Sequence, residues 1–481
     1  MTRRELGGWI KQTVPIDVLV PETAMRWRPL VEDAIAYIFT HISKQRIAAK
    51  LQEQLLLPLE TPAEMRLLRL ISRMPGLQKM GQVVARNRRI PVKLREALSQ
   101  LENGMSDVTA PEIHAIIQDR LGDRLERYAV KLAPEILSEA SVSAVVRFSW
   151  GMPERERQEG VFKVLKPYVP AAFAEDMKVL QELGEYLAGK GRKYGFAVHE
   201  VRDTLEEVRL LLAHELDFSR EQTTLGIAAR MYRSSFGIRV PRLIPELCAE
   251  GITAMSAEAG VKVTEAARRA PIRRERIAAQ IVEALIAVPF FAWEDTVLFH
   301  ADPHAGNLLY DEPNRELVVL DWALAEQLDR ESRRQLVLLA AMTILRDREG
   351  VSSAIEALAR DRGAETTAVI RRHVEGLFAK CPKGQAPGVL DAMMLLDAIA
   401  LDGVHFPPAL FLFRKVLFTL EGVLHDVAGH DVRIDQVVVR EFLARAAASF
   451  GLFHAPLKGS DFLKIERDAL WYPVRRWRAV S

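Results

Sequence analysis

Two apolar runs that each end in aspartate constrain the fold and chemistry of this chain more than any other feature. The first is Leu298-Phe299-His300-Ala301-Asp302, and the second is Val318-Val319-Leu320-Asp321. Asn307 lies five positions after Asp302 and fourteen before Asp321. Such an arrangement is typical of phosphoryl transfer, which needs a base and oxygen ligands for Mg²⁺. We predict Asp302 as the base, and Asn307 and Asp321 as the metal ligands.

Each of these residues has a structural alternative. Asp and Asn also favour turns and helix N-caps, so Asp302 and Asn307 could be turn residues and Asp321 could cap the next helix. A hydrolytic metal site with His300, Asp302 and His304 as ligands is another alternative. The shared spacing, with each residue following a strand-like run, favours phosphoryl transfer. No second cluster of ligand-type residues in the sequence supplies the other half of a hydrolytic site.

Composition sets the limits within which this chemistry must fit. The chain has 481 residues, 49% of them hydrophobic, which is too long for one typical domain. Lys and Arg number 66 against 64 Asp and Glu, so overall charge gives no indication of nucleic acid binding. The only cysteines, Cys248 and Cys381, lie far apart, which argues against a disulfide framework and fits a reducing compartment. With no apolar signal segment and no run near the roughly 18–20 residues that span a bilayer, we expect a cytoplasmic protein that is at most peripheral to a membrane.

Hydrophobic spacing divides the chain into four parts. We predict a helical extension over 1–70, a second helical segment over 71–130, a strand-containing lobe over 131–260 and a helical lobe over 261–481. The predicted strands lie within 136–165, 237–241 and 251–255, and the predicted hinge between the lobes is 256–260. The predicted helices are 201–232, 277–293, 333–346, 351–360, 366–379, 389–401, 408–425 and 437–450.

Lys163 alternates with apolar residues on a predicted strand that returns from a charged turn. This pattern resembles the strand lysine that pairs with nucleotide phosphates in kinases, and the alternative is a solvent-facing lysine on an edge strand. A kinase-type lysine needs a carboxylate partner on a following helix, and the candidates are Glu215, Asp217 and Glu221. Glu215 and Asp217 are two positions apart, so on one helix they would face different sides.

With these residues in place, Lys79-Met80-Gly81-Gln82 resembles the K-x-G-Q motif of the UbiB/AarF family of atypical protein-kinase-like proteins. That family is associated with ubiquinone and other isoprenoid-lipid metabolism, and the resemblance runs from about residue 76 to residue 427. It implies an α+β, two-lobed protein-kinase-like fold with an N-terminal helical extension and a mostly helical C-terminal lobe. It also implies that ATP and Mg²⁺ are the cofactors.

The resemblance assigns roles to matching residues. Glu215-x-Asp217 matches the family's E-x-D motif, Lys163 its nucleotide-binding lysine and Glu221 its helix glutamate, while Asp302, Asn307 and Asp321 match the catalytic and metal positions. The implied nucleotide-binding residues are Lys163, Glu215, Glu221, Ser141 and Ser143. The implied gating residues, in part on a segment expected to fold over the active site, are Lys79, Gly81, Gln82 and Asp217.

Two departures from the family pattern bear on activity. The alanine-rich loop, which stands where ordinary kinases have a glycine-rich one, reads Ser138-Glu139-Ala140-Ser141-Val142-Ser143-Ala144. Glu139 would bring a carboxylate near the phosphates, so we expect Glu139→Ala to tighten ATP binding. The position of the kinase D-F-G motif reads Asp321-Trp322-Ala323, which keeps the metal ligand and replaces its two neighbours.

The resemblance therefore implies an ATP-binding atypical kinase or ATPase in isoprenoid-lipid or quinone metabolism. Expected partners are the nucleotide, a lipid-like or quinone-like small molecule and a peripheral membrane surface, and no nucleic acid is expected. If Lys79 lies near the site carboxylates, its segment would occupy the groove that a protein substrate needs; the alternative is a solvated lysine on a packing helix.

Two rival functions stay open. One is a nucleotide-sensing pseudokinase scaffold. The other is a small-molecule phosphotransferase, since the catalytic stretch also resembles aminoglycoside and choline kinases, although the K-x-G-Q stretch argues against it. The arginine-rich stretch 475–478 is expected to be a solvated face, with anionic lipid contact as its alternative.

Overall fold

The computed structural model divides the chain into two compact units. Unit 1 comprises Met1–Gln222 and Leu243–Ala257, and unit 2 comprises Thr223–Arg242 and Glu258–Ser481. One crossing between units, after Ala257, falls within the predicted hinge. Residues 223–242, which the sequence placed in the first lobe, belong to unit 2. The structure describes residues 25, 28–79, 107–151, 157–190, 209, 212–382, 387–429, 434–435 and 456–480.

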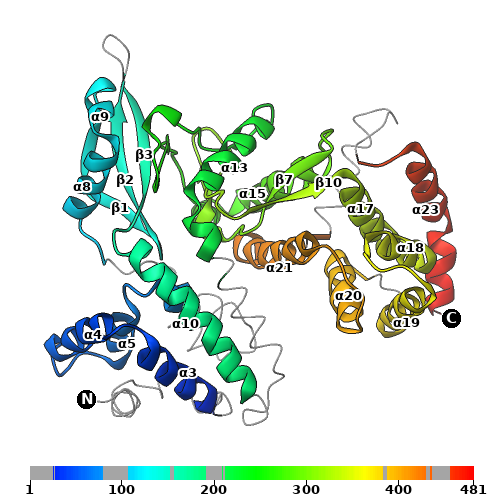
Figure 1. Cartoon of the computed structure of the whole chain (residues 1–481). Coiled ribbons are helices and arrows are strands. Elements are labelled where there is room, and N and C mark those ends of the chain that lie inside the picture. The colour runs from blue at the N-terminus through cyan, green and yellow to red at the C-terminus, as the bar shows by residue number, and fades with distance from the viewer. Residues whose placement is uncertain are drawn as a thin grey trace. The chain divides into compact units, whose positions relative to one another are not determined.

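Unit 1 contains a four-stranded antiparallel sheet of order β1-β2-β3-β5 (Figure 1). Val146 and Phe148 of β2 and Phe162 of β3 are buried, as expected of strands with one face on a core. Gly160 on β3 pairs with Phe148, and a Cβ at Gly160 would lie 2.4 Å from the Phe148 ring, so this close approach requires glycine. The strands are β1 (Lys131–Glu139), β2 (Ser143–Trp150), β3 (Gln158–Leu165) and β5 (Ile252–Ser256).

Helices make up the rest of unit 1. Within the predicted extension, Ile38 and Phe39 of α3 are buried in one core cluster with Leu180 and Leu183 of α10. Thr109 begins α8 with a capping box to Glu112, which satisfies the first backbone N–H groups of the helix. The helices are α3 (Arg28–His41), α4 (Lys44–Leu56), α5 (Ala63–Ile71), α8 (Ala110–Leu121), α9 (Asp123–Arg127) and α10 (Val169–Gly189).

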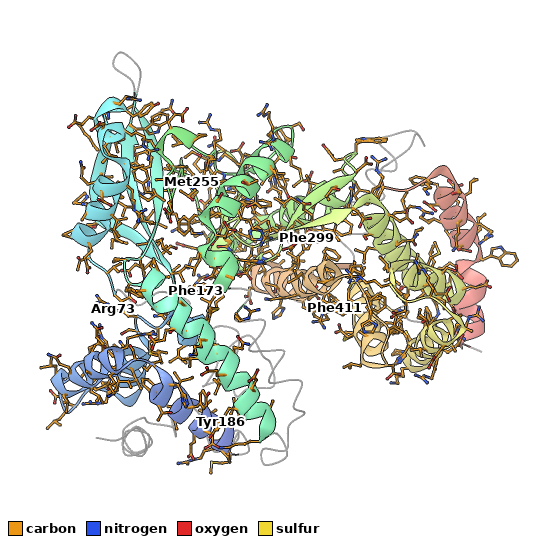
Figure 2. All side chains as sticks on the ribbon, in the orientation of Figure 1. Arg73, Phe173, Tyr186, Met255, Phe299 and Phe411 are labelled. Atoms are coloured by element: carbon orange, nitrogen blue, oxygen red, sulfur yellow. The ribbon has the colours of Figure 1, made fainter. Side chains whose placement is uncertain are left out.

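Unit 2 holds short strands and many helices. A four-stranded sheet has the order β4-β9-β8-β6, and β7 pairs with β10 in a separate two-stranded sheet. Phe299 of β7, labelled in Figure 2, packs edge-on against Phe413 with the ring centroids 5.8 Å apart. The strands are β4 (Ile238–Arg239), β6 (Val261–Lys262), β7 (Thr296–His300), β8 (Leu308–Asp311), β9 (Glu316–Val319) and β10 (Ala325–Asp329). The helices are α13 (Phe218–Met231, which begins in unit 1), α14 (Val263–Arg269), α15 (Arg274–Val282), a π-helical turn (Glu283–Ala287), α16 (Val288–Phe290), α17 (Arg330–Ile344), α18 (Arg348–Leu358), α19 (Ala364–Lys380), α20 (Val389–Leu401), α21 (Pro408–Ala428) and α23 (Gly459–Val480).

These elements confirm the predicted α+β fold class and correct three details. The chain after Asp321 is not wholly helical, because β10 forms by pairing with β7; the cap of the next helix, α17, is Asp329. The predicted helix over 201–232 breaks at Asp217, whose Oδ1 accepts a hydrogen bond from Arg220 N at 2.8 Å, so α13 begins after it. Helix α23 was not predicted, and the predicted helix 437–450 lies outside the described residues.

Across the described residues, no helix combines the length and the apolar content that crossing a membrane requires.

Candidate functional site

The first group of predicted site residues lies in unit 1 around Lys163. Its Nζ lies 2.6 Å from Oε1 of Glu221, in the first turn of α13. β3 has partners on both sides, with Lys163 opposite Val145 on β2 and Thr253 on β5, so the edge-strand alternative is wrong. Of the three candidate carboxylates, the structure pairs Glu221 with Lys163. The pair is mostly buried, so the ammonium is held in a fixed position against Glu221.

Another ion pair of unit 1 joins Lys79 to Glu215. Lys79 is only 4% exposed, so it is not a solvated surface lysine. The other carboxylate oxygen of Glu215 accepts a hydrogen bond from Ser141 Oγ at 3.0 Å, and Ser141 lies in the loop between β1 and β2. Glu215 therefore connects the segment that carries Lys79 to the alanine-rich loop.

The segment that leads to Lys79 is also fixed to α10. Gly76 N donates to Asp176 Oδ2 at 2.9 Å, and Asp176 in turn pairs with Arg46 of α4 at 2.6 Å. A Cβ on Gly76 would lie 3.1 Å from Leu180 and 3.2 Å from Asp176, so a larger residue there would require these side chains to shift.

Glu139 does not lie where the sequence analysis expected it. Its carboxylate is buried, 3.0 Å from Lys166 Nζ, and Lys166 also contacts Asp107 Oδ1 at 2.8 Å. Tyr168 completes the cluster: burial and the Asp107 carboxylate raise the pKa of its phenol, which stays protonated and donates to Asp107 Oδ2 at 2.8 Å. Since Lys166 already offsets the charge of Glu139, the expectation that this carboxylate repels phosphates loses its basis.

The third group of predicted residues lies in unit 2 around His300 at the end of β7. The Asp302 N–H donates to His300 Nδ1 at 3.2 Å, so the Nε2–H faces the Leu320 carbonyl oxygen at 2.9 Å. Burial lowers the pKa of His300 and keeps the ring neutral, which this tautomer requires. His300 thus ties the loop that carries Asp302 to the backbone next to Asp321.

Asn307 and Asp321 are brought together by the hairpin of β8 and β9. Leu308 pairs with Val319, and one step beyond the ladder Leu320 N donates to the Asn307 carbonyl oxygen at 2.8 Å. The Asn307 side-chain amide N donates to the Asp302 carbonyl oxygen at 3.2 Å, which orients its amide.

Asp321 adopts a left-handed backbone conformation, with φ +52°. Such a conformation costs free energy for any residue with a side chain, and it is common where a carboxylate must be aimed. Trp322, which follows, is buried against the His300 ring at 5.0 Å and donates its indole N–H to the Val319 carbonyl oxygen at 3.2 Å. Trp322 therefore fixes the backbone on the C-terminal side of Asp321.

The donor set of this group fits Mg²⁺. One carboxylate and one amide oxygen, with a second carboxylate at Asp302, are the hard oxygen ligands that this ion prefers. Because the Asn307 amide N is engaged by Asp302, its oxygen is the atom left to face a metal. Among the described residues no three His, Cys, Asp or Glu side chains cluster as a metal site.

The remaining predicted residues are placed as follows. Ser143 is buried at the start of β2, Asp217 caps α13, and Gly81 and Gln82 lie outside the described residues. The sequence analysis gave no role in the preferred site to His300, although its spacing from Asp302 was the available signal. It also missed Lys166, for which no local pattern in the sequence gives a signal.

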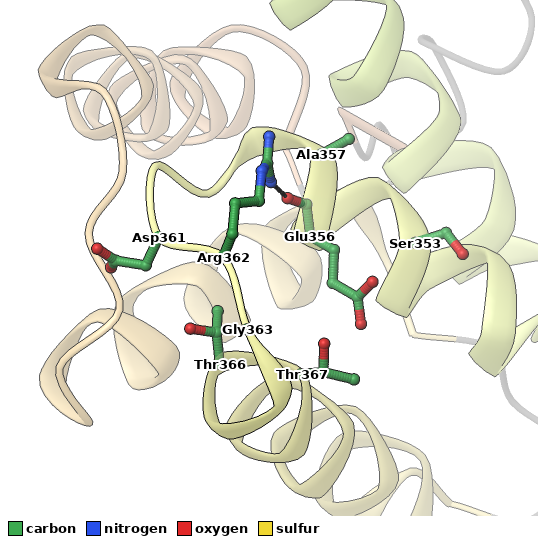
Figure 3. A pocket seen from close by; sticks show the side chains of 8 residues that line it. All are labelled: Ser353, Glu356, Ala357, Asp361, Arg362, Gly363, Thr366 and Thr367. Carbon is green, nitrogen blue, oxygen red and sulfur yellow. Dashed lines mark hydrogen bonds between the residues drawn. The ribbon is translucent and has the colours of Figure 1, made fainter.

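A polar pocket of about 270 Å³ lies between α18 and the start of α19 (Figure 3). No predicted site residue lines it. Its Asp361 accepts hydrogen bonds from His405, and its Arg362 donates to the Glu356 carbonyl oxygen, so these side chains secure the connection between the two helices.

Comparison with known proteins gives a family match and remote relatives. The ABC1 atypical kinase-like domain matches residues 100–355. The chain is 25% identical over 425 residues to a Xylella fastidiosa protein named probable protein kinase UbiB, a match covering 85% of this chain and 72% of that protein. It is also 25% identical over 366 residues to an uncharacterized protein of Synechocystis sp., covering 74% of this chain and 60% of that relative's length.

Among solved structures, the chain is similar to a Mycobacterium tuberculosis protein solved as a complex with erythromycin. The TM-score is 0.47 at 20% sequence identity, and the match covers 82% of this chain and 97% of the other.

Proposed function

Since this chain belongs to the ABC1 atypical kinase-like family, we propose that it binds ATP with Mg²⁺ and acts as an atypical kinase or ATPase in isoprenoid-lipid or quinone metabolism. The observation that carries the proposal is the buried pair of Lys163 and Glu221, 2.6 Å apart, which joins a central strand to a helix. Kinases use such a pair to hold a lysine against the nucleotide phosphates.

Each residue has a defined task in this proposal. Lys163 Nζ binds phosphate oxygens and Glu221 keeps it oriented. Asp302 accepts the proton of the attacking hydroxyl group or water as the new P–O bond forms and the bond to the leaving ADP oxygen breaks. Asn307 and Asp321 would hold Mg²⁺, which supplies charge neutralisation at the phosphates.

The proposed acceptor is water or a small lipid-like or quinone-like molecule rather than a peptide. Support comes from Lys79, which is buried in an ion pair with Glu215 instead of standing in solvent. Lys79 belongs to the K-x-G-Q stretch, which ordinary protein kinases lack. A segment held by such an ion pair would occupy the groove that a protein substrate needs.

The test is Mg²⁺-dependent ATP binding and phosphate release by the purified full chain, with and without liposomes. Lys163→Met should abolish measurable ATP binding, because it removes the ammonium and leaves Glu221 without this cation. Lys178→Met is the matched control: Lys178 lies on α10 in the same unit and its side chain is 76% exposed. ATP affinity that is equal in wild type and Lys163→Met would contradict the proposal.

A nucleotide-binding scaffold without turnover is the second candidate. It is favoured by the Asp321-Trp322-Ala323 sequence, because the buried indole of Trp322, hydrogen-bonded to the Val319 carbonyl oxygen and packed against His300, takes the place of the D-F-G phenylalanine next to Asp321. Tight Mg²⁺-dependent ATP binding with no phosphate release and no transfer to any lipid acceptor would decide for the scaffold.

A further inference from the structure

Helix α23 exposes a row of large apolar side chains. Leu463, Leu470 and Trp471 are 69%, 80% and 55% exposed. Their spacing, with Arg467 between them, is that of one stripe along a helix. Single exposed leucines are ordinary on protein surfaces, whereas a stripe of three large apolar residues on one helix indicates a contact surface.

The opposite face of α23 is fixed to its own unit. Both carboxylate oxygens of Asp461 accept hydrogen bonds from the Arg334 guanidinium of α17, each at 2.7 Å. Asp468, about two helical turns further along the same face, is fully buried. Figure 1 shows α23 alongside α17. The helix is therefore anchored with its apolar stripe turned outward.

The charge on α23 is unevenly distributed. Asp461 and Asp468 are buried on the anchored face, so Glu466 is the one exposed acidic residue of the helix. The basic residues of the helix are Lys464, Arg467, Arg475, Arg476 and Arg478. A basic helix with leucine and tryptophan on its free face has the composition of helices that lie in the interface of anionic membranes.

We propose that α23 docks this protein on an anionic lipid surface, with Leu463, Leu470 and Trp471 inserted at the acyl boundary and Arg467 against phosphate headgroups. Tryptophan favours this boundary, where its ring is apolar and its N–H meets polar groups. A second copy of the chain is a poorer occupant, because a two-fold contact centred on the stripe would bring the Arg467 side chains of both copies together. This inference is independent of whether the chain hydrolyses ATP.

The test is co-sedimentation of the full chain with vesicles of phosphatidylcholine alone and of phosphatidylcholine containing phosphatidylglycerol. We expect binding to the anionic vesicles that weakens as salt is raised. Leu470→Glu should reduce vesicle partitioning about tenfold or more, since it replaces the leucine that would insert into the lipid by a charge that anionic headgroups repel. Trp471→Ala is a second variant that adds no charge.

The matched control is Leu401→Glu on α20, where the leucine is 79% exposed and the helix itself carries no basic residue. This variant should bind vesicles like the wild type, and circular dichroism should show all variants folded. Equal partitioning of wild type and Leu470→Glu, or equal loss in Leu401→Glu, would overturn the proposal. A wild-type dimer that Leu470→Glu converts to monomers would overturn it in favour of a contact between copies.

Discussion

Replacing Lys166 tests whether Glu139 serves the stability of unit 1 rather than the repulsion of phosphates. Lys166 is 1% exposed and contacts two buried carboxylates, Asp107 at 2.8 Å and Glu139 at 3.0 Å. Lys166→Met would leave both carboxylates buried without their shared cation. Glu139→Gln would instead leave a one-to-one pair of Lys166 and Asp107, with an amide oxygen still able to accept the Asp107 N–H.

The two variants should differ clearly in free energy of unfolding. Removing one partner from a buried ion pair costs about 3–5 kcal/mol, and Lys166→Met should fall in or above that range because two carboxylates are affected. Glu139→Gln exchanges one charged hydrogen bond for a neutral one, which costs about 1 kcal/mol. Lys178→Met, at an exposed site on α10, should change stability by about 0.5 kcal/mol or less.

The assay is urea unfolding followed by circular dichroism, together with a fluorescent-ATP titration of each folded variant. We expect the order of stability to be Lys178→Met, Glu139→Gln and then Lys166→Met, and we expect ATP affinity to be unchanged in Glu139→Gln. Two results would refute the reasoning. One is a Lys166→Met protein as stable as wild type, and the other is ATP binding that tightens several-fold in Glu139→Gln, since the carboxylate would then face phosphates after all.

Four further substitutions test the sites. Asp302→Asn should keep ATP binding and lower any turnover by about 10²–10⁴, measured as phosphate release. Asp321→Asn should remove the Mg²⁺ dependence of ATP binding, since an amide lacks the charge that the ion needs; an unchanged Mg²⁺ titration would contradict the assignment. Lys79→Ala should change ATP affinity or hydrolysis several-fold in a folded protein, because Glu215 is left without its cation. A folded variant with wild-type ATP affinity and hydrolysis rate would contradict a gating role for Lys79. Burial alone would raise the pKa of Asp461, but the hydrogen bonds from Arg334 outweigh it and lower that pKa, so its contribution to stability is present above about pH 4 and lost as pH falls further; Asp461→Asn should flatten this acid limb in urea unfolding.

The hydrophobic periodicity of the sequence was sufficient to predict the strands and helices that bury one regular face. β2 and β3 alternate buried and outward side chains, and the helices from α17 to α21 repeat apolar residues at helical spacing. β10 could not be predicted in this way, because Ala325-Glu326-Gln327-Leu328-Asp329 has no clear alternation. It is a strand because Ala325 and its neighbours pair with β7, and this pairing does not depend on an alternating pattern within 325–329.

The choice of partner for each lysine was also beyond the sequence. From the residues alone, Glu215, Asp217 and Glu221 were all candidates while 201–232 was treated as one helix, and the family resemblance left Glu215 or Glu221 as the partner of Lys163. The structure separates these two glutamates: Asp217 caps α13 and ends the preceding helical turn, so Glu215 and Glu221 lie on different elements and pair with different lysines. Aspartate is a common N-cap residue, so Asp217 could be recognised as a possible cap within this segment. Only the structure shows that its side chain makes the capping hydrogen bond.

The geometry of the catalytic group depends on one hairpin register. Leu308 faces Val319 across β8 and β9, and because side chains alternate along a strand, a slip of one residue would turn every side chain of β9 to the other face. The same register places Leu320 where its N–H meets the Asn307 carbonyl oxygen and its own carbonyl meets His300. Asp321 follows directly, in a left-handed conformation that the preceding hydrogen bonds and the buried Trp322 fix on both sides. The spacing of fourteen residues between Asn307 and Asp321 is therefore the length of a hairpin that returns the chain to the same point, and this is why the spacing carries chemical information that neither residue carries alone.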